Sequence, residues 1–239
     1  MELDQPAIQR LIKDRLFYNE FQPLWNTSKD TIFAYEAFIR TKPFMDPLML
    51  FDVARNMGLL YKLDTASISN AIKEYPYGHL DKYLLFVNVF PSTIIHPDFP
   101  EFIDGLLRIY EEIKSKVVFE INEDPAEEHY WEEPSFRNRL SFLRDSGFLI
   151  AYDDLTYTSS SIRKIRQYVP DFTKLDRSCS QNLSDSLEKQ KHVGYFVSNS
   201  FKEMVVVLEG IETNDDFLTA KQLGVPLLQG YFIAKPHRL

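Results

Sequence analysis

The sequence is poor in cysteine, in positive charge and in long apolar runs, and each shortage excludes a class of protein. Cys179 is the one cysteine among 239 residues, so no internal disulfide can form, which fits a reducing cytosol. No His lies near it in the sequence, and we interpret it as a spectator rather than a nucleophile. No apolar run reaches the roughly 20 residues of a membrane span and no signal-peptide pattern is present, so we expect a soluble, cytoplasmic protein.

The shortage of positive charge excludes one kind of partner. The chain has 27 Lys and Arg against 35 Asp and Glu, a formal net charge of −8, which argues against a nonspecific nucleic-acid surface. We therefore expect no DNA partner. A small anionic ligand is compatible with this charge if local cations, including metals, hold it. The five His show no ligand-type spacing.

Apolar residues, in contrast, are plentiful, with 19 Phe, 13 Tyr and a hydrophobic fraction of 44%. A chain of 239 residues with this content suits one α/β barrel, since such barrels run to roughly 200–250 residues without division. We expect a single domain over residues 1–239. A leading helix is predicted within residues 1–18, because apolar residues recur at helical spacing between positions 7 and 17.

A short polar turn, 26–30, joins the first two predicted strands, 21–25 and 31–40. A parallel crossover needs a dozen or more residues, so this pair is predicted to be antiparallel. Along the second strand, Glu36, Phe38 and Arg40 point to one face. An acid and an Arg on one face would suit a phosphate and its metal, but they would equally suit a solvated face.

Helix and strand signals alternate through the rest of the chain. Asp46 and Pro47 form a helix start with Gly58 as its stop, and a second helix is predicted over 63–75. From residue 84 a strand and a helix follow each other five times before a last strand, which gives about eight strands in all. Later helices are predicted at 102–113, 124–144, 159–168, 184–200 and 214–224, with a turn over 91–100.

Most of the predicted strands end at a polar residue. The valine-rich run 204–208 stops at Glu209, and the other runs stop at Asn88, Glu120, Asp153-Asp154, Asp176 and Gln229. Ligands of α/β proteins bind at the carboxyl ends of strands. One such end alone is equally well a surface turn whose acids favour the next helix. Their repetition predicts one shared site able to bind metal or move protons.

Together these segments resemble the EAL domain family, which hydrolyses the bacterial second messenger cyclic di-GMP. The resemblance covers nearly the whole chain and keeps the family's order. The signature segment is Tyr35-Glu36-Ala37-Phe38-Ile39-Arg40. The other matching segments are 21–23, 47–64, 87–91, 119–123, 153–154, 174–178, 209–213 and 229–231.

The resemblance implies an α/β fold, a TIM-barrel variant (β/α)8 with one antiparallel strand and a site at its C-terminal face. It also implies a two-metal site for Mg²⁺ or Mn²⁺, ions that prefer hard oxygen ligands. Glu36, Asn88, Glu120 and Asp153 would bind one ion. Asp153 would bridge to a second ion, held also by Asp154 and supported by Asp176.

Further roles follow from the same resemblance. Glu209, as general base, and Lys174 would flank the attacking water, and Arg40 would hold a phosphate. Other residues would line the site or contact substrate: Gln22, Phe38, Glu212 and Gln229. Glu123 would anchor the loop after Asp154. Two metals about 3.5–4 Å apart would neutralise the phosphodiester and activate water, yielding linear pGpG.

The chain departs from the family pattern at three places. Phe38 stands where the signature has Leu. Residues 155–161 read Leu-Thr-Tyr-Thr-Ser-Ser-Ser where the family has Phe-Gly-x-Gly-Tyr-Ser-Ser, so both glycines are missing and we expect another backbone path. The family's usual closing helix has no counterpart before Leu239, so we expect a truncated chain, or the leading helix or a partner on that flank.

Three functions compete on this evidence. A metal-dependent cyclic di-GMP phosphodiesterase is favoured, because the acids, Asn88 and Lys174 are all present. The alternative is a receptor that binds cyclic di-GMP with little or no hydrolysis and signals through a protein partner, as the altered 155–161 loop and Phe38 suggest. A scaffold without a nucleotide has the least support, since it has no need for clustered acids. A homodimer is compatible with each.

Overall fold

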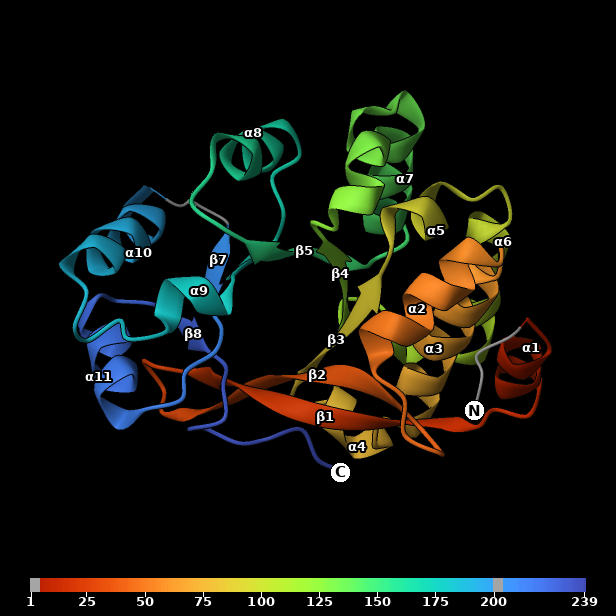
Figure 1. Ribbon diagram of the computed structural model, residues 1–239, viewed down its shortest axis with the longest axis horizontal. Helices are drawn as coiled ribbons and strands as arrows, with labels where there is room; N and C mark the ends of the chain where they lie inside the picture. The colour runs from red at the N-terminus through yellow and green to blue at the C-terminus, as the bar shows by residue number, and fades with distance from the viewer. Residues whose placement is uncertain (1–4, 200–203) are drawn as a thin grey trace.

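Eight strands close into a barrel in the computed structural model, which describes residues 5–199 and 204–239 (Figure 1). Neighbours in the barrel are neighbours in the chain, and β8 closes on β1. β1 runs antiparallel to β2 and β8, while the other pairs are parallel. The predicted barrel with one antiparallel strand is confirmed. The strands are β1 (Phe17–Asn26), β2 (Thr31–Thr41), β3 (Leu84–Val89), β4 (Val117–Asn122), β5 (Leu149–Leu155), β6 (Phe172–Leu175), β7 (Val205–Leu208) and β8 (Leu227–Leu228).

Helices surround the strands on the outside of the barrel (Figure 1). They are α1 (Gln5–Lys13), α2 (Pro47–Asn56), α3 (Leu60–Glu74), α4 (Tyr77–Leu80), α5 (Pro91–Ile95), α6 (Phe99–Ile109), α7 (Pro134–Asp145), α8 (Ser159–Gln167), α9 (Arg177–Ser180), α10 (Leu187–Asn199) and α11 (Asn214–Gln222), with 3-10 helices η1 (Glu111–Ile113) and η2 (Pro125–Glu132). Among the described residues, none of the helices combines the length and apolar character needed to cross a bilayer.

Capping residues fix several helix starts where the sequence predicts them. The Asp46 carboxylate accepts hydrogen bonds from the backbone N–H groups of Leu48 and Met49, directly before α2. The Thr213 hydroxyl accepts from the backbone N–H of Asp216 and starts α11. Each cap satisfies a donor that the first helical turn leaves unpaired. These caps set the point at which each chain segment turns away from the barrel mouth.

Three predicted elements are wrong in extent or type. The leading helix ends at Lys13, not beyond residue 16, because Phe17 is already the first residue of β1 and is buried in the cluster that contains Ile8 and Leu11 of α1; residues 1–4 lie outside the described part. The predicted turn over 91–100 contains the short helix α5, since Pro91 suits a first helical position. The predicted helix over 124–144 is two elements, η2 and α7, because Pro134 lacks the N–H that would continue η2.

One apolar side chain from each strand fills the middle of the barrel. These are Leu24, Ala34, Phe86, Val118, Ala151, Phe172, Val207 and Leu227. Because side chains alternate along a strand, the next inward position lies two residues further on. In the antiparallel β1, that step runs backwards along the chain. The apolar layer therefore forms a dry floor beneath a second, polar layer at the barrel mouth.

Candidate active site

The polar layer above the floor contains one residue from each strand in turn. Two residues beyond each floor position, and two before it in β1, lie Gln22, Glu36, Asn88, Glu120, Asp153, Lys174, Glu209 and Gln229. Strand register supports this arrangement, since Asn88 pairs with Glu120 across β3 and β4. The predicted strand-end residues therefore converge on one mouth of the barrel, except that Lys174 rather than Asp176 represents β6 in this layer. Period-two alternation on eight strands is the physical cause of the cluster.

A single ammonium group lies at the centre of this layer. The Nζ atom of Lys174 is 2.9 Å from Glu36, 2.7 Å from Glu120, 3.1 Å from Asp153 and 2.6 Å from Glu209. The Lys174 side chain is fully buried. One positive charge facing four carboxylates leaves the ionised cluster with three uncompensated negative charges. Such an excess in a buried place favours either protons or a metal cation.

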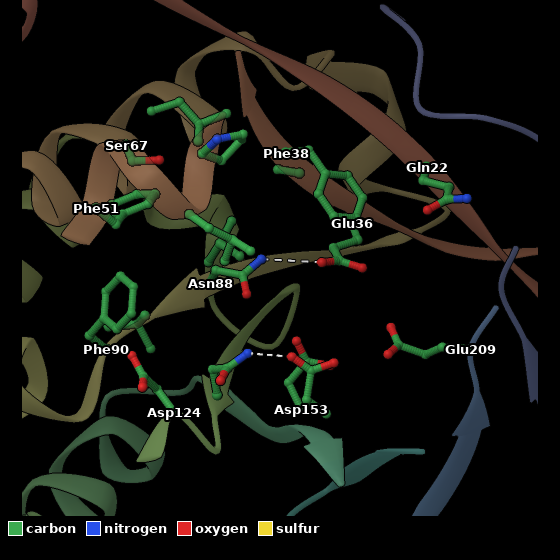
Figure 2. A pocket seen from close by; sticks show the side chains of 18 of the residues that line it. Gln22, Glu36, Phe38, Phe51, Ser67, Asn88, Phe90, Asp124, Asp153 and Glu209 are labelled. Carbon is green, nitrogen blue, oxygen red and sulfur yellow. Dashed lines mark hydrogen bonds between the residues drawn. The ribbon is translucent and has the colours of Figure 1, made fainter. Parts of the chain in front are cut away.

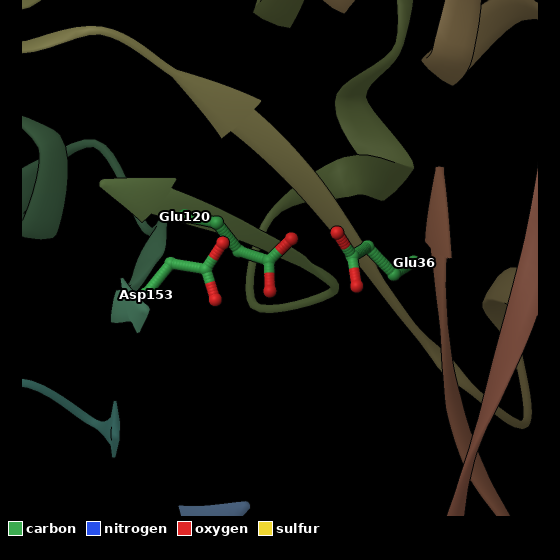
Figure 3. A group of neighbouring side chains, drawn as sticks. All are labelled: Glu36, Glu120 and Asp153. Carbon is green, nitrogen blue, oxygen red and sulfur yellow. The ribbon is translucent and has the colours of Figure 1, made fainter. Parts of the chain in front are cut away.

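Two groups of carboxylates are close enough to share an ion. Oxygens of Glu36, Glu120 and Asp153 lie within 4.8 Å of one another, and so do oxygens of Asp153, Asp154 and Glu209. Figure 3 shows the first group, with the three carboxylates turned toward one another from separate strands. Asp153 belongs to both groups, which is the position that a bridging ligand would have.

The donor set fits a hard divalent cation. Neither buried oxygen of Glu120 accepts a hydrogen bond from any described residue, and the same is true of Asp153 Oδ1, although the Lys174 ammonium lies close to both residues. Buried polar atoms without hydrogen bonds are rare in folded proteins, so each needs an explanation. Carboxylate oxygens with an adjacent amide oxygen, here that of Asn88, are the ligands that Mg²⁺ and Mn²⁺ prefer.

Burial dominates the acid–base properties of the cluster. It raises the pKa of Glu120 well above its ordinary value, with Glu36 adding to the effect. Burial likewise raises the pKa of Glu209 well above its usual range and that of Asp153 to about 7. Burial alone would lower the pKa of Lys174, but the surrounding carboxylates, Asp153 first, raise it well above its normal value. Lys174 is therefore a permanent cation, while the acids hold protons readily until a cation replaces them.

Amide side chains complete the inner wall. Gln229 donates from Nε2 to Glu36 Oε2 at 2.7 Å, and Asn88 donates from Nδ2 to Glu36 Oε1 at 3.2 Å. Gln22 donates to the backbone oxygen of Ala234 at 2.9 Å, while its own Oε1 accepts from Gln229 at 3.2 Å. These bonds fix the orientation of Glu36, so its carboxylate is aimed before any ion arrives.

Asp154 and Glu123 lie beside the inner layer on the β4 and β5 edges. Asp154 has a φ of 57° and accepts a hydrogen bond from Asn122 Nδ2 at 2.6 Å. Glu123 accepts from the Ser161 hydroxyl at 2.8 Å and lies 2.9 Å from the Lys164 ammonium. The predicted loop anchor therefore has contacts on α8, the helix that begins within the altered 155–161 segment.

Three other predicted residues line the same cavity but have partners of their own. Arg40 pairs with Glu20 of β1 at 2.8 Å, and Glu212 pairs with Arg177 at 2.9 Å. Asp176 caps α9 by accepting from the Ser178 N–H at 2.8 Å and belongs to neither carboxylate group. Phe38 lines the cavity next to Glu36 (Figure 2).

The cavity itself has a volume of about 790 Å³ and extends beyond the polar layer. Figure 2 shows Glu36, Gln22 and Glu209 at one end and the rings of Phe51 and Phe90 at the other. The distal wall was not predicted from the sequence. The available signal is the spacing of Phe51 and Arg55, one turn apart on α2, together with Phe90 two residues after Asn88.

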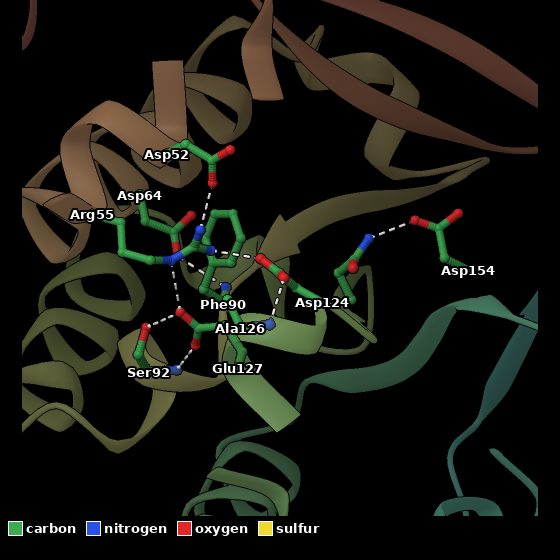
Figure 4. Close-up of polar contacts among 10 residues, drawn as sticks. Asp52, Arg55, Asp64, Phe90, Ser92, Asp124, Ala126, Glu127 and Asp154 are labelled. Carbon is green, nitrogen blue, oxygen red and sulfur yellow. Dashed lines mark hydrogen bonds and ion pairs between the residues drawn. The ribbon is translucent and has the colours of Figure 1, made fainter. Parts of the chain in front are cut away.

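Arg55 holds this distal wall together. Its guanidinium pairs with Asp52 at 2.6 Å, Asp124 at 2.7 Å and Glu127 at 3.3 Å, and it lies over the ring of Phe90 (Figure 4). Glu127 in turn accepts from the backbone N–H of Ser92 at 2.7 Å. One side chain thus joins α2, the loop after β3 and η2 around the far end of the cavity.

Comparison with known proteins agrees with this geometry. A family model described as the EAL domain matches residues 5–236. The chain belongs to the EAL domain family. It is 26% identical, over 247 residues, to the cyclic di-GMP phosphodiesterase PdeF of Escherichia coli K12, a match that covers 99% of this chain and 32% of PdeF. The chain thus spans about a third of that relative's length.

Solved EAL structures have the same fold. BlrP1 of Klebsiella pneumoniae, in complex with calcium and cyclic di-GMP, superimposes with a TM-score of 0.82 at 25% identity, covering 93% of this chain and 56% of BlrP1. The EAL domain of FimX from Xanthomonas citri, in complex with cyclic di-GMP, gives a TM-score of 0.84 at 18% identity, covering 97% and 92%. At 18% identity, the similarity to FimX shows a shared fold and nothing more.

Proposed function

We propose that this EAL domain is a metal-dependent phosphodiesterase that hydrolyses cyclic di-GMP to linear pGpG with Mg²⁺ or Mn²⁺. The observation that carries the proposal is the pair of carboxylate groups that share Asp153, with buried oxygens free of hydrogen bonds, beside a buried lysine. The similarity to PdeF and to BlrP1, which has also been solved with manganese and cyclic di-GMP, supports the choice of substrate and metal.

In this proposal Glu36, Asn88, Glu120 and Asp153 hold one ion. Asp153 and Asp154 hold the second, with Asp176 supporting that position from the cavity wall. Two such ions neutralise the phosphodiester, lower the pKa of a bound water and stabilise the leaving oxygen. The layered fold contributes pre-organisation, since Gln229 and the Asn88 amide already orient Glu36.

Glu209 acts as the general base in this scheme. Burial raises the pKa of its carboxyl, so the ionised form is a stronger base than a free glutamate. Lys174, 2.6 Å from Glu209, opposes part of this rise in pKa and offers a positive charge to the reacting phosphate. Glu209 would take a proton from the water as the water oxygen forms the new bond to phosphorus and the bond to the ribose O3′ breaks, and O3′ would take up a proton from solvent, so that one water is added overall.

Substrate contacts follow from the lining of the cavity. Arg40 would contact a phosphate, and its pairing with Glu20 holds the guanidinium at the rim. Phe38 offers an apolar face next to Glu36. Further lining groups, Gln22, Glu212 and Gln229, would contact the ligand or support those that do.

The second candidate is a receptor that binds cyclic di-GMP with slow or absent turnover and passes the signal to a protein partner. The observation in its favour is the loop at 155–161, where neither family glycine is present and Thr158 instead caps α8 by accepting from the Ser161 N–H. A loop that misplaces Asp154 would leave nucleotide binding intact but would lower the affinity of the site for the second metal ion.

One experiment separates the two. The protein is incubated with cyclic di-GMP and Mn²⁺ or Mg²⁺, and pGpG is measured, while nucleotide binding is measured in Ca²⁺. The phosphodiesterase predicts product that falls at least a hundredfold in Glu209→Gln while binding is retained, consistent with loss of a general base worth roughly 10²–10⁴-fold. Tight binding without product in the native protein supports the receptor. Absence of binding contradicts both.

A further inference from the structure

A second buried lysine lies outside the polar layer, on α8. Lys164 is 4% exposed, and its ammonium is 2.9 Å from Glu123 and 2.5 Å from Glu128, over the ring face of Trp131 at 4.7 Å. Lysine is almost never fully buried without paired charges, so the ion pairs account for its position. Both carboxylates belong to the segment that leads from β4 through η2.

Two serines at the start of α8 reach the same two glutamates. The Ser161 hydroxyl donates to Glu123 Oε2 at 2.8 Å, and the Ser160 hydroxyl donates to Glu128 Oε1 at 3.2 Å. Helix α8 is therefore attached to the β4–η2 segment along its whole first turn. Lys164 supplies the buried positive charge at this attachment, and it separates two acids that would otherwise repel each other.

The same two chain segments meet again at the barrel mouth. There Asp154, directly after Asp153, accepts from Asn122, one residue before Glu123 (Figure 4). Residues 155–158 connect this contact to α8 without a glycine. The end of β5 that carries Asp154 and the loop after it are thus held against one segment at two points, by the Asn122 amide at the mouth and by Lys164 on α8.

We propose that Lys164 is a positioning residue for the second metal, acting through the β5–α8 loop rather than by contact with the ion. This inference rests on the proposed two-metal function. Three of the first metal's ligands, Glu36, Asn88 and Glu120, belong to β2, β3 and β4, outside the β5–α8 loop. The fourth, Asp153, is held by the pairing of β5 with Asn122 of β4. Asp154 lies at the end of β5, at a φ of 57°, where its carboxylate direction follows the path of the loop.

The decisive comparison is between two variants that each remove one positive charge from α8. Lys164→Met keeps an apolar stem against Trp131 and removes the buried charge. Arg163→Met removes an exposed ion pair between the same elements, Arg163 to Glu132 at 2.9 Å, and is the matched control. Mn²⁺ binding is followed by loss of the free-ion electron paramagnetic resonance signal, without substrate.

Loss of a group that hydrogen-bonds a metal ligand weakens metal affinity by about 10–100-fold. Lys164 lies one contact further out, so in Lys164→Met we expect the second, weaker Mn²⁺ site to lose about tenfold, the low end of that range. The tighter site should stay within about twofold of the native value, and excess Mn²⁺ should recover most of the turnover. Lys164→Arg should restore the weaker site, because it restores the charge. Arg163→Met should bind both ions as the native protein does.

Superimposable titrations of Lys164→Met and the native protein would overturn the inference. So would an equal weakening of both sites, which is the mark of a general loss of structure. If Lys164→Met fails to fold, Glu128→Gln serves instead, since Glu128 is 44% exposed and Lys164 keeps Glu123; about threefold weakening of the second site alone is expected. If the native protein binds no Mn²⁺, the proposed function is overturned together with the inference. If the native protein binds two Mn²⁺ ions and Lys164→Met binds them equally well, only the inference about Lys164 fails.

Discussion

Glu120→Gln should make the metal-free protein more stable and at the same time reduce what Mn²⁺ adds to its stability. Glu120 is fully buried, and neither of its oxygens accepts a hydrogen bond from a described residue. It gains from Lys174 at 2.7 Å but opposes Glu36 and Asp153, whose oxygens lie within 4.8 Å. The variant removes the charge while keeping the shape of the side chain.

The magnitudes follow from these distances. At an effective dielectric constant of about 20, attraction at the Lys174 distance is about 6 kcal/mol, and repulsion at the 4.8 Å limit is about 3.5 kcal/mol from each of two acids. Attraction and repulsion nearly cancel, so the cost of burying the charge decides whether Glu120→Gln raises or lowers the free energy of unfolding. The carboxyl can also avoid this cost by taking up a proton, which limits the effect of the substitution. We therefore expect Glu120→Gln to raise the free energy of unfolding of the metal-free protein by about 1–3 kcal/mol. For a chain of this size that raises Tm by about 2–4 °C for each kcal/mol.

Mn²⁺ reduces this difference in stability between the two proteins. At a Mn²⁺ concentration a hundred times its dissociation constant, binding stabilises the native protein by about 2.7 kcal/mol. A tenfold weaker site in Glu120→Gln would gain only about 1.4 kcal/mol from the same Mn²⁺. Thermal unfolding of both proteins in chelator and in Mn²⁺ measures the effect, with Glu111→Gln, an exposed acid on η1, as the control. A Glu120→Gln protein that is less stable in chelator, or that keeps the full Mn²⁺ gain, would refute the reasoning.

Three further outcomes are expected. Burial raises the pKa of Asp153 to about 7, so the folded metal-free protein keeps a proton that the unfolded chain releases near pH 4. The free energy of unfolding should therefore fall as the pH rises from about 4 to 7. Thermal unfolding in chelator should show a smaller fall for Asp153→Asn than for the native protein. Gly230→Ala places a Cβ 2.1 Å from the backbone oxygen of Ile211 and should cost roughly 2–4 kcal/mol in denaturant unfolding, whereas Gly105→Ala in α6, with open space around it, should be neutral or stabilising by up to about 1 kcal/mol; equal effects would contradict the close approach of β8 to the 211 loop. Arg55→Met should raise KM for cyclic di-GMP several-fold with little change in Mn²⁺ affinity, because Arg55 supports the far wall and no carboxylate of the metal groups, and an altered Mn²⁺ titration would place it elsewhere.

The sequence was sufficient for the features that depend on local pattern. Strand alternation and the short 26–30 turn predicted an antiparallel first pair, and the register of β1 against β2 confirms it. The polar strand ends predicted a common site, because a closed sheet brings carboxyl ends to one mouth. The step of two from the apolar floor to the polar layer explains why Glu36, Glu120 and Glu209 meet although they are far apart in the chain.

Features that depend on contacts between elements could not be predicted from the sequence. Lys164 has the pattern of an ordinary helix-surface lysine, and its burial arises only because η2 brings Glu128 and Trp131 over α8. Arg55 likewise has an unremarkable place on α2 until η2 supplies Asp124 and Glu127. The partners of Arg40 and Glu212 were missed for the same reason, since each lies on a different element.

The most direct test of the central claim is the anomalous scattering of manganese in crystals of the Glu209→Gln protein grown with Mn²⁺ and cyclic di-GMP. The account predicts two manganese peaks about 3.5–4 Å apart at the barrel mouth, with Asp153 between them. One ion should contact Glu36, Asn88 and Glu120, and the other should contact Asp154. Manganese located only outside this mouth, or absent from it while the nucleotide is bound, would contradict the account.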